Sequence, residues 1–242
     1  MKLRKMMLTL SCVGFLPSVL HGASIAVNFS ENGSNQTFIG GQIIGPTGID
    51  SSNWNNTASL GDPPVGSFTA GSVIDDSGAN VPLAVVSWSA PNMYYTGGAP
   101  TGNDAGKLVA GYLDEGSGNP NGFSIVNHEF VQYDLYIIVA GDGGNANGGT
   151  GTFLHDGFTI NGQDYGSFTA LGQNQGAMVE ATGPTAGNYV KYSGLTGDLT
   201  VAGNSGDGRT PINGFVIVAV PEPSSSALIG LGGLALILRR RK

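Results

Sequence analysis

The stretch Tyr133-Asp134-Leu135-Tyr136-Ile137-Ile138-Val139 decides the fold that we predict for this chain. Successive side chains of a β-strand point to opposite faces, so one face here carries Tyr, Leu, Ile and Val, while the other still carries Tyr136 and Ile138. A strand that is apolar on both faces is buried on both, and we expect it at the centre of a sheet. The last such stretch, 215–219, is also apolar on both sides, and we expect it to pair with the first strand, 24–29.

Short segments with β character recur along the rest of the chain, every ten to twenty residues, with turn residues between them. Glycine accounts for 41 of 242 residues, far above the usual share of about 7%. No stretch shows a sustained helical period with caps. The sequence therefore predicts an all-β fold, an antiparallel β-sandwich of jelly-roll type. The further expected strands are 37–44, 83–89, 107–113, 122–126, 131–140, 157–161, 165–170, 177–181, 188–192, 198–202 and 212–220.

The first 24 residues have the pattern of a secretory signal peptide, with a cationic start, an apolar stretch that we expect to be helical, and small residues after it. Two cleavage positions fit this pattern. A cut after Ala23 leaves His21 three positions back, whereas a cut after Ser24 places Gly22 there. The mature chain is therefore expected to begin near Ser24 or Ile25.

The end of the chain, 220–242, consists of three parts in a fixed order. The triplet Pro221-Glu222-Pro223 comes first, an apolar run of twelve residues follows at 227–238, and Arg239-Arg240-Arg241-Lys242 closes the chain. As a helix, the apolar run spans about 18 Å, short of the roughly 30 Å of a bilayer's hydrocarbon. The four cations are retained on the cytoplasmic side, so a short transmembrane helix here would leave residues 25–219 as a body outside the inner membrane.

This order of parts resembles the PEP-CTERM sorting tail of Gram-negative bacterial surface proteins. The resemblance implies that a membrane-embedded exosortase recognises Pro221, Glu222 and Pro223, cuts near them, and releases the body to the cell surface or the exopolysaccharide matrix. Contact with the inner membrane would then be transient. An ordinary C-terminal anchor is the alternative.

The body also resembles the β-sandwich bodies of PEP-CTERM proteins, which are similar in layout to galactose-binding-like and malectin-like domains. This second resemblance rests on fold analogy, which does not transmit function. The segments that carry it are 25–29, 111–114, 133–136, 141–142, 188–190 and 211–214.

The body is strongly acidic. Residues 24–220 hold three basic and sixteen acidic residues, which gives a net charge of −13. Such a surface repels phosphate backbones, so binding to nucleic acids is disfavoured. Solubility outside the cell explains this charge, and binding of calcium or a cationic polymer is the more specific alternative. The single cysteine, Cys12, lies in the signal peptide, so disulfides and thiolate chemistry are excluded from the body.

No catalytic signature is present, and we expect the body not to be an enzyme. The segment His128-Glu129-Phe130-Val131-Gln132 begins like a zincin motif, but Gln132 stands where a second histidine must be. His128 and His155 are expected to be loop or edge-strand residues. A glycoside-active enzyme stays as the less favoured alternative. Its two catalytic carboxylates are brought together by the fold, so they need no fixed spacing in the sequence.

The candidate metal site is a calcium site at Asp142, Asn145 and Asn147, in a glycine-rich loop directly after the central strand. These side chains offer hard oxygen ligands. Their spacing does not fit an EF-hand, and a simple polar turn is the alternative; no other cofactor is expected. Lesser candidates are Asp75-Asp76, Asp114-Glu115 and Asp207.

The candidate carbohydrate-binding residues are Trp54, Tyr94 and Tyr95, because sugars stack on aromatic faces while neighbouring amides bind their hydroxyl groups. The alternative is that Trp54 and Trp88 fill the core. We therefore expect an exported protein of the cell surface or exopolysaccharide matrix with a structural or adhesive body. A carbohydrate-binding module is the alternative function.

Overall fold

The structure is a computed structural model in which nine segments of the chain are described. Within them the chain forms fifteen strands and one short helix, α1 (Asp104–Leu108). The prediction of an all-β protein built from antiparallel sheets is confirmed. The described segments are residues 23–29, 45–46, 51–57, 63–95, 104–116, 120–141, 151–173, 177–206 and 208–221.

The first large sheet has five strands and contains both the first and the last strand of the body. Its neighbouring strands run antiparallel, except that β2 lies parallel to β1. In spatial order the strands are β13 (Tyr189–Leu195), β8 (Tyr133–Ile138), β15 (Gly214–Ala219), β1 (Ser24–Asn28) and β2 (Asn55–Asn56).

The second large sheet has six strands, all antiparallel to their neighbours. In spatial order they are β11 (Gln163–Tyr165), β10 (Phe158–Ile160), β14 (Leu199–Gly203), β7 (Gly122–Val126), β4 (Val85–Ser89) and β3 (Val65–Phe68). Two ribbons complete the fold: β5 (Asn92–Tyr95) with β6 (Gly111–Asp114), and β9 (Thr152–His155) with β12 (Phe168–Leu171).

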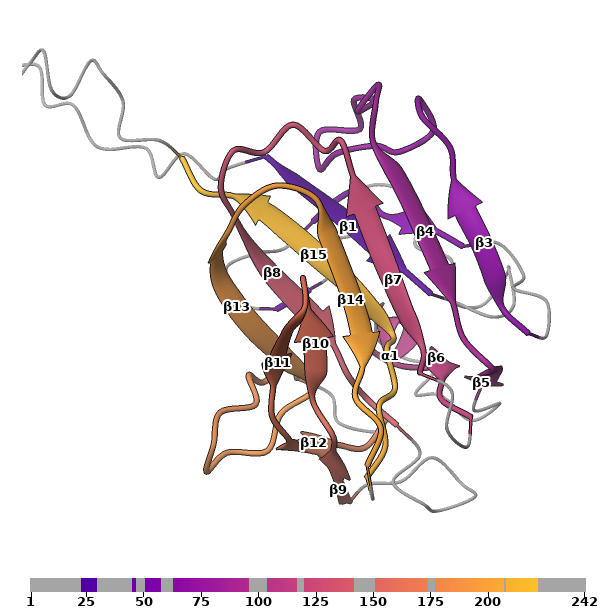
Figure 1. The fold of residues 1–242 in the computed structure, drawn as a ribbon, viewed down its shortest axis with the longest axis vertical. Coiled ribbons are helices and arrows are strands. Elements are labelled where there is room, and N and C mark those ends of the chain that lie inside the picture. Colours follow the sequence, from indigo (N-terminus) through magenta and orange to yellow (C-terminus); the bar gives the residue numbers. More distant parts are fainter. Residues whose placement is uncertain are drawn as a thin grey trace, which may run out of the picture.

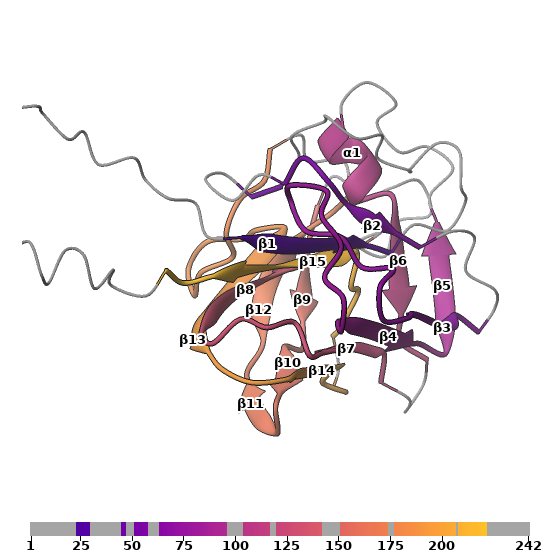
Figure 2. The ribbon, with the colours of Figure 1, turned by 90° about the horizontal axis from the view of Figure 1, so that it is seen from above.

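The two large sheets pack face to face as a β-sandwich (Figure 1), and the view from above separates them into two layers (Figure 2). Aromatic rings join the layers. Phe123 of β7 stacks on Phe215 of β15 with ring centroids 4.2 Å apart, and Phe29 contacts both rings. Burying one such ring contributes about 1.5–3 kcal/mol, so this cluster is a main source of cohesion between the sheets.

Strand β8 is central, as its sequence predicts. It lies between β13 and β15, and one of its faces sends Leu135 and Ile137 into the main core between the sheets. Its other face sends Tyr136 and Ile138 into a second, smaller core on the outside of the five-stranded sheet. Residues near α1 cover that side (Figure 2), and the second core also contains Trp54, Leu108 and Val109.

The predicted pairing of the first and last strands is confirmed. β1 runs antiparallel to β15, with Ser24 opposite Val218 and Asn28 opposite Gly214. The pairing continues beyond the strand ends, since the Ala219 amide donates to the Ala23 carbonyl oxygen over 2.9 Å. Both ends of the described body therefore lie at the same end of the sandwich.

Several predicted strands are wrong or incomplete. Residues 107–113 form the end of α1 followed by β6, because the helical turn carries Leu108 and Val109 into the second core. Residues 177–181 form no strand; the Asn188 side chain binds their backbone, accepting from the Val179 amide over 2.7 Å. Strand 165–170 is divided between β11 and β12, and β2, β3, β5 and β9 were not predicted.

Other predictions fall outside the described residues. These are the strand at 37–44, the signal helix, the apolar helix at 227–238 and the basic end at 239–242. Within the described segments, no helix has the length and apolar character needed to cross a membrane.

Buried asparagine side chains fasten the ribbon of β5 and β6 to the sandwich. Asn213 is fully buried; its Oδ1 accepts from the Ala140 amide over 2.6 Å, and its Nδ2 donates to the Gly111 carbonyl oxygen over 2.9 Å. Asn121 Nδ2 donates to the carbonyl oxygens of Leu113 and Thr210 over 2.7 and 2.6 Å. These amides bond to buried backbone groups, which would be costly to leave unpaired, and so join segments distant in the chain.

The register of β15 predicts where the chain can be cut without loss of the fold. A body of residues 24–221 keeps every rung of β15, and we expect a cooperative thermal transition. A body that ends at Val216 loses the buried Ile217, and we expect its Tm to fall by about 10 °C or more. Differential scanning calorimetry of the two chains checks this; equal transitions, or a non-cooperative longer chain, would contradict it.

Candidate functional site

The open surface of the sandwich is the outer face of the six-stranded sheet. The corresponding face of the five-stranded sheet is apolar and covered by the second core. On the six-stranded sheet, the strand period sends large apolar side chains inward and leaves small polar ones outside. The inward residues of its three central strands are Val86, Trp88, Phe123, Ile125, Leu199 and Val201.

A row of four hydroxyl side chains crosses this face. Ser67 lies opposite Ser87, Ser87 opposite Ser124, and Ser124 opposite Thr200, on the neighbouring strands β3, β4, β7 and β14. Adjacent strands lie about 4.8 Å apart, so the row extends over roughly 14 Å. All four side chains are exposed or half-buried, which leaves their hydroxyl groups free to bind a ligand or water.

A shallow groove of about 610 Å³ lies over this row. A second row lies two positions further along each strand: it has small residues at Ser89, Gly122 and Ala202, and the exposed Val65 on β3. Gly122 is required here, since a Cβ atom at this position would lie 2.4 Å from the Val201 carbonyl oxygen. The described residues that line the groove include no charged side chain, so it is a neutral, hydroxyl-lined surface.

A polar pocket continues the groove toward β10 and β11, sharing Pro120 and Ala202 with it. Its centre is Asn204. The Asn204 Nδ2 donates to Asp164 Oδ1 over 2.6 Å, and its Oδ1 accepts from the Thr159 hydroxyl over 2.8 Å. Asp156 also lines this pocket and accepts the Gly208 amide over 3.0 Å. Carboxylate and amide groups in this arrangement can bind a ligand rich in hydroxyl groups.

Two of the three candidate carbohydrate-binding residues, Trp54 and Tyr94, do not line the groove. Trp54 is 6% exposed, packs in the second core, and donates its indole N–H to the Ser51 carbonyl oxygen over 3.0 Å. Tyr94 is half-buried on β5 with its ring 5.4 Å from that of Tyr112. The side chain of Tyr95 lies outside the described part of the structure. The alternative that Trp54 and Trp88 fill cores agrees with their burial.

The candidate calcium residues Asp142, Asn145 and Asn147 lie outside the described residues, as does Asp207. Of the lesser candidates, Asp114 and Glu115 bind a cation already supplied by the chain. Arg209 donates to Asp114 Oδ1 over 2.8 Å and to Glu115 Oε1 over 3.4 Å. Among the described residues, no three His, Cys, Asp or Glu side chains gather where they could hold a metal ion.

The two histidines of the body are buried and hold turns. His128 Nε2 binds the Gly197 carbonyl oxygen over 2.9 Å, and its Nδ1 accepts from the Phe130 amide. His155 stacks on Phe168 with ring centroids 4.4 Å apart, and burial lowers its pKa to about 3. The ring of His155 is therefore neutral at physiological pH, and burial also lowers the pKa of His128.

Sequence reasoning missed the groove because it missed β3 and the register between strands. The alternation of serine with large apolar residues in Val85–Ser89 is a signal of an open outer face. It could have been found in that strand alone, but alignment of Ser67, Ser87, Ser124 and Thr200 into one row depends on long-range pairing.

At the end of the body, Val220 donates its amide to the Gln132 carbonyl oxygen over 2.9 Å, and the next residue, Pro221, is exposed. Pro221, the first residue of the sorting triplet, thus lies just after the last strand of the described body; Glu222 and Pro223 lie outside the described residues. Residues 219–242 match the PEP-CTERM protein-sorting motif. The chain ends in a PEP-CTERM sorting signal. No curated protein and no solved structure matches the chain.

The PEP-CTERM match covers the tail and not the sandwich. It supports processing by exosortase and export to the cell surface through a membrane-associated sorting step. The function of the body has to be argued from its own surfaces.

The ionisation of Asp114, which is paired with Arg209, leads us to predict that the stability of the fold depends on pH. Burial raises the pKa of Asp114 to about 6, although the Arg209 cation opposes this shift. The folded protein then holds this proton more tightly than the unfolded chain, so the contribution of Asp114 to stability falls as pH rises from about 4 to about 6. We expect Asp114→Asn to remove this fall in urea unfolding measured across the range.

The matched control is Asp198→Asn on the exposed turn before β14, which we expect to keep the pH profile of the unmodified protein. A profile for Asp114→Asn that superimposes on the unmodified one would contradict the assignment.

Proposed function

We propose that this protein is sorted by exosortase through its C-terminal tail and resides on the cell surface or in the exopolysaccharide matrix. There its sandwich has a structural or adhesive role and no catalytic one. The tail supports the destination, and the body supports the role, because it is a closed sandwich with one broad, open sheet face.

The observation that carries the adhesive role is the neutral groove with its hydroxyl row. Ser87 and Ser124 stand at the middle of the row, and the pocket around Asn204 extends it. A surface of hydroxyl, amide and carboxylate groups can exchange its water for the hydroxyl groups of a polysaccharide. The length of the row, roughly 14 Å, suits an extended chain better than a single sugar.

Charge narrows the class of ligand. The groove lining is uncharged while the body as a whole carries −13, so polyanions are repelled and a neutral polysaccharide is favoured. In this proposal the body binds polymer weakly and at many positions. A dedicated carbohydrate-binding module that selects one short oligosaccharide is the second candidate, and the carboxylate and amide groups of the pocket at Asp164 favour it.

The proposal also includes a fold type for the sandwich and a metal ion for one of its loops. The sandwich is taken to be of jelly-roll type with a galactose-binding-like layout, and calcium is retained as a candidate ligand of the loop at 142–147. The glycoside-active alternative would use Asp156 and Asp164, which line one pocket. It requires two opposed carboxylates about 5–10 Å apart with room for a sugar between them.

Affinity electrophoresis of the 24–221 body through gels with a neutral β-glucan or anionic alginate tests the groove. We expect the neutral polymer to retard the body, and Ser124→Arg to weaken binding at least about tenfold, because it places a bulky unpaired cation in the groove. Alginate is expected to have no effect. The gels are run with and without calcium to test the loop at 142–147.

The matched control is Ser193→Arg, an equal change at an exposed position of β13 in the other sheet. We expect it to bind as the unmodified body does. Equal retardation of Ser124→Arg and the unmodified body would remove the groove as the binding site. If a short oligosaccharide added at low concentration abolishes the retardation by the polymer, the dedicated module is favoured.

The sorting part of the proposal is tested separately in cells. We expect the full chain to reach the cell surface in a host with exosortase, and to stay in the inner-membrane fraction when the exosortase gene is deleted. Immunoblots of fractionated cells measure this. Surface delivery without exosortase would contradict the sorting role of the tail, whatever the body binds.

A further inference from the structure

Ser24 is the first residue that is integrated into the body. Ala23 is exposed, whereas Ser24 is 4% exposed and lies opposite Val218 at the start of β1. Ser24 also makes a reciprocal pair of bonds with Asp76. The Ser24 backbone nitrogen donates to Asp76 Oδ1 over 3.0 Å, and the Asp76 amide donates to the Ser24 carbonyl oxygen over 2.9 Å.

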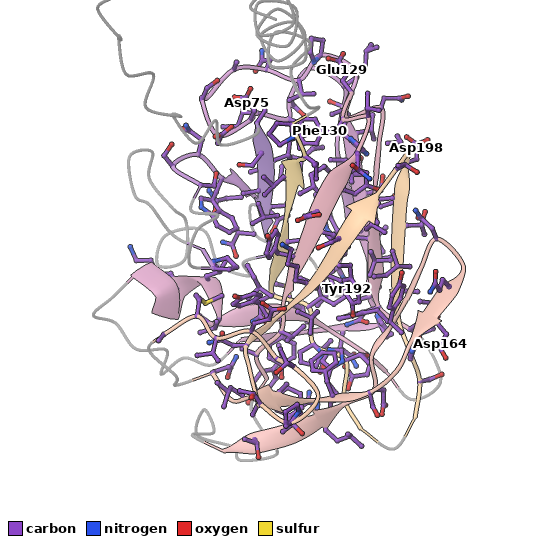
Figure 3. All side chains as sticks on the ribbon, turned by 90° about the vertical axis from the view of Figure 1, so that its left-hand side faces the viewer. Asp75, Glu129, Phe130, Asp164, Tyr192 and Asp198 are labelled. Atoms are coloured by element: carbon purple, nitrogen blue, oxygen red, sulfur yellow. The ribbon has the colours of Figure 1, made fainter. Side chains whose placement is uncertain are left out.

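Asp76 is held in place from its other side. The Asp76 carbonyl oxygen accepts from the Ser52 hydroxyl over 2.9 Å and from Asn53 Nδ2 over 2.7 Å. Its neighbour Asp75 folds the same turn, accepting the Ala79 amide over 2.9 Å. Figure 3 shows Asp75 at the same end of the sandwich as Glu129. The backbone of Asp76, whose carboxylate meets Ser24, is thus held by a loop and a turn as well as by β1.

The two cleavage positions left open by the sequence have different consequences for these contacts. A cut after Ser24 removes the rung opposite Val218 and leaves both the carboxylate and the amide of Asp76 without their Ser24 partners. Among the bonds of the described residues, a cut after Ala23 removes the one from the Ala219 amide to the Ala23 carbonyl oxygen, at an exposed position that water can reach.

We infer that the mature protein begins at Ser24 and that Asp76 binds its free α-ammonium group. The atom that donates to Asp76 Oδ1 in the uncut chain is the same nitrogen that becomes this ammonium. Cleavage replaces a neutral N–H by a cation without moving the atom, and hydrogen bonds between ionised partners are roughly twice as strong as neutral ones. An α-amino group is protonated at neutral pH.

This ion pair would fasten the first strand of the body. β1 pairs with β15 in the five-stranded sheet, and the sorting tail continues from the end of β15. In this inference, the removal of the signal peptide during export strengthens the strand pair beside the tail. It rests on secretory cleavage and is independent of what the groove binds.

The first test is the intact mass of the protein exported by a Gram-negative host. We expect the mass of a chain that begins at Ser24. A chain that begins at Ile25 or later would overturn the inference, since the nitrogen that faces Asp76 would then be absent.

The second test separates the ion pair from a neutral hydrogen bond. Two bodies are prepared from cleavable fusions, one beginning at Ser24 and one extended by Gly22 and Ala23, and Asp76→Asn is made in each. The extended body has an amide at Ser24 and keeps the bonds seen in the structure. We expect Asp76→Asn to lower Tm by about 2–4 °C more in the Ser24 body than in the extended one.

Two comparisons keep this test decisive. Asp198→Asn, at an exposed turn, is expected to change both bodies equally. If Asp76→Asn prevents folding, the two bodies with Asp76 intact are compared in low and high NaCl, and we expect salt to lower the Tm of the Ser24 body selectively. Equal effects of Asp76→Asn in the two bodies, or equal salt dependence, would overturn the ion pair.

Discussion

The fold depends on a sheet whose central strands are apolar on both faces. Leu135 of β8 and Ile217 of β15 point into the sandwich, while Tyr136 and Val216 point away from it, and all four are buried. Each buried side chain of this size contributes about 1.5–3 kcal/mol, and exposing either face would forfeit that contribution. The five-stranded sheet must therefore be covered twice, by the six-stranded sheet on one side and by α1 and the loop that carries Trp54 on the other.

This double cover determines which surface is free. The six-stranded sheet buries one face only, so its strands alternate between large apolar residues such as Trp88 and small polar ones such as Ser87. Its outer face is left for solvent or a ligand, and the groove forms there because Gly122 and Ala202 carry little or no side chain. The open neutral face is thus a consequence of the layering, while its hydroxyl groups are a separate property of the sequence.

Local pattern was enough to predict the all-β class, the central position of β8 and the pairing of β1 with β15, since all three follow from apolar periodicity. The groove and the asparagine braces could not be predicted in the same way. Asn121 and Asn213 look like turn residues in sequence, but each is buried and binds backbone groups of segments distant in the chain. Trp54 also differs from the prediction. Its polar neighbours in the sequence indicated a carbohydrate-binding residue, whereas its ring packs in the second core, among residues distant in the chain.

The two ends of the described body and the groove occupy different parts of the sandwich, so the sorting tail and the surface proposed to bind polymer are separate. Ala23 and Ala219 are hydrogen-bonded neighbours, so the described body begins and ends at adjacent positions, next to the predicted signal peptide and the sorting tail. The groove lies on a sheet face, lined by strand residues such as Ser124 and Thr200. Among the described residues, the bonds of the sandwich end at Val220, so a cut at or after Pro221 would remove no strand of either large sheet.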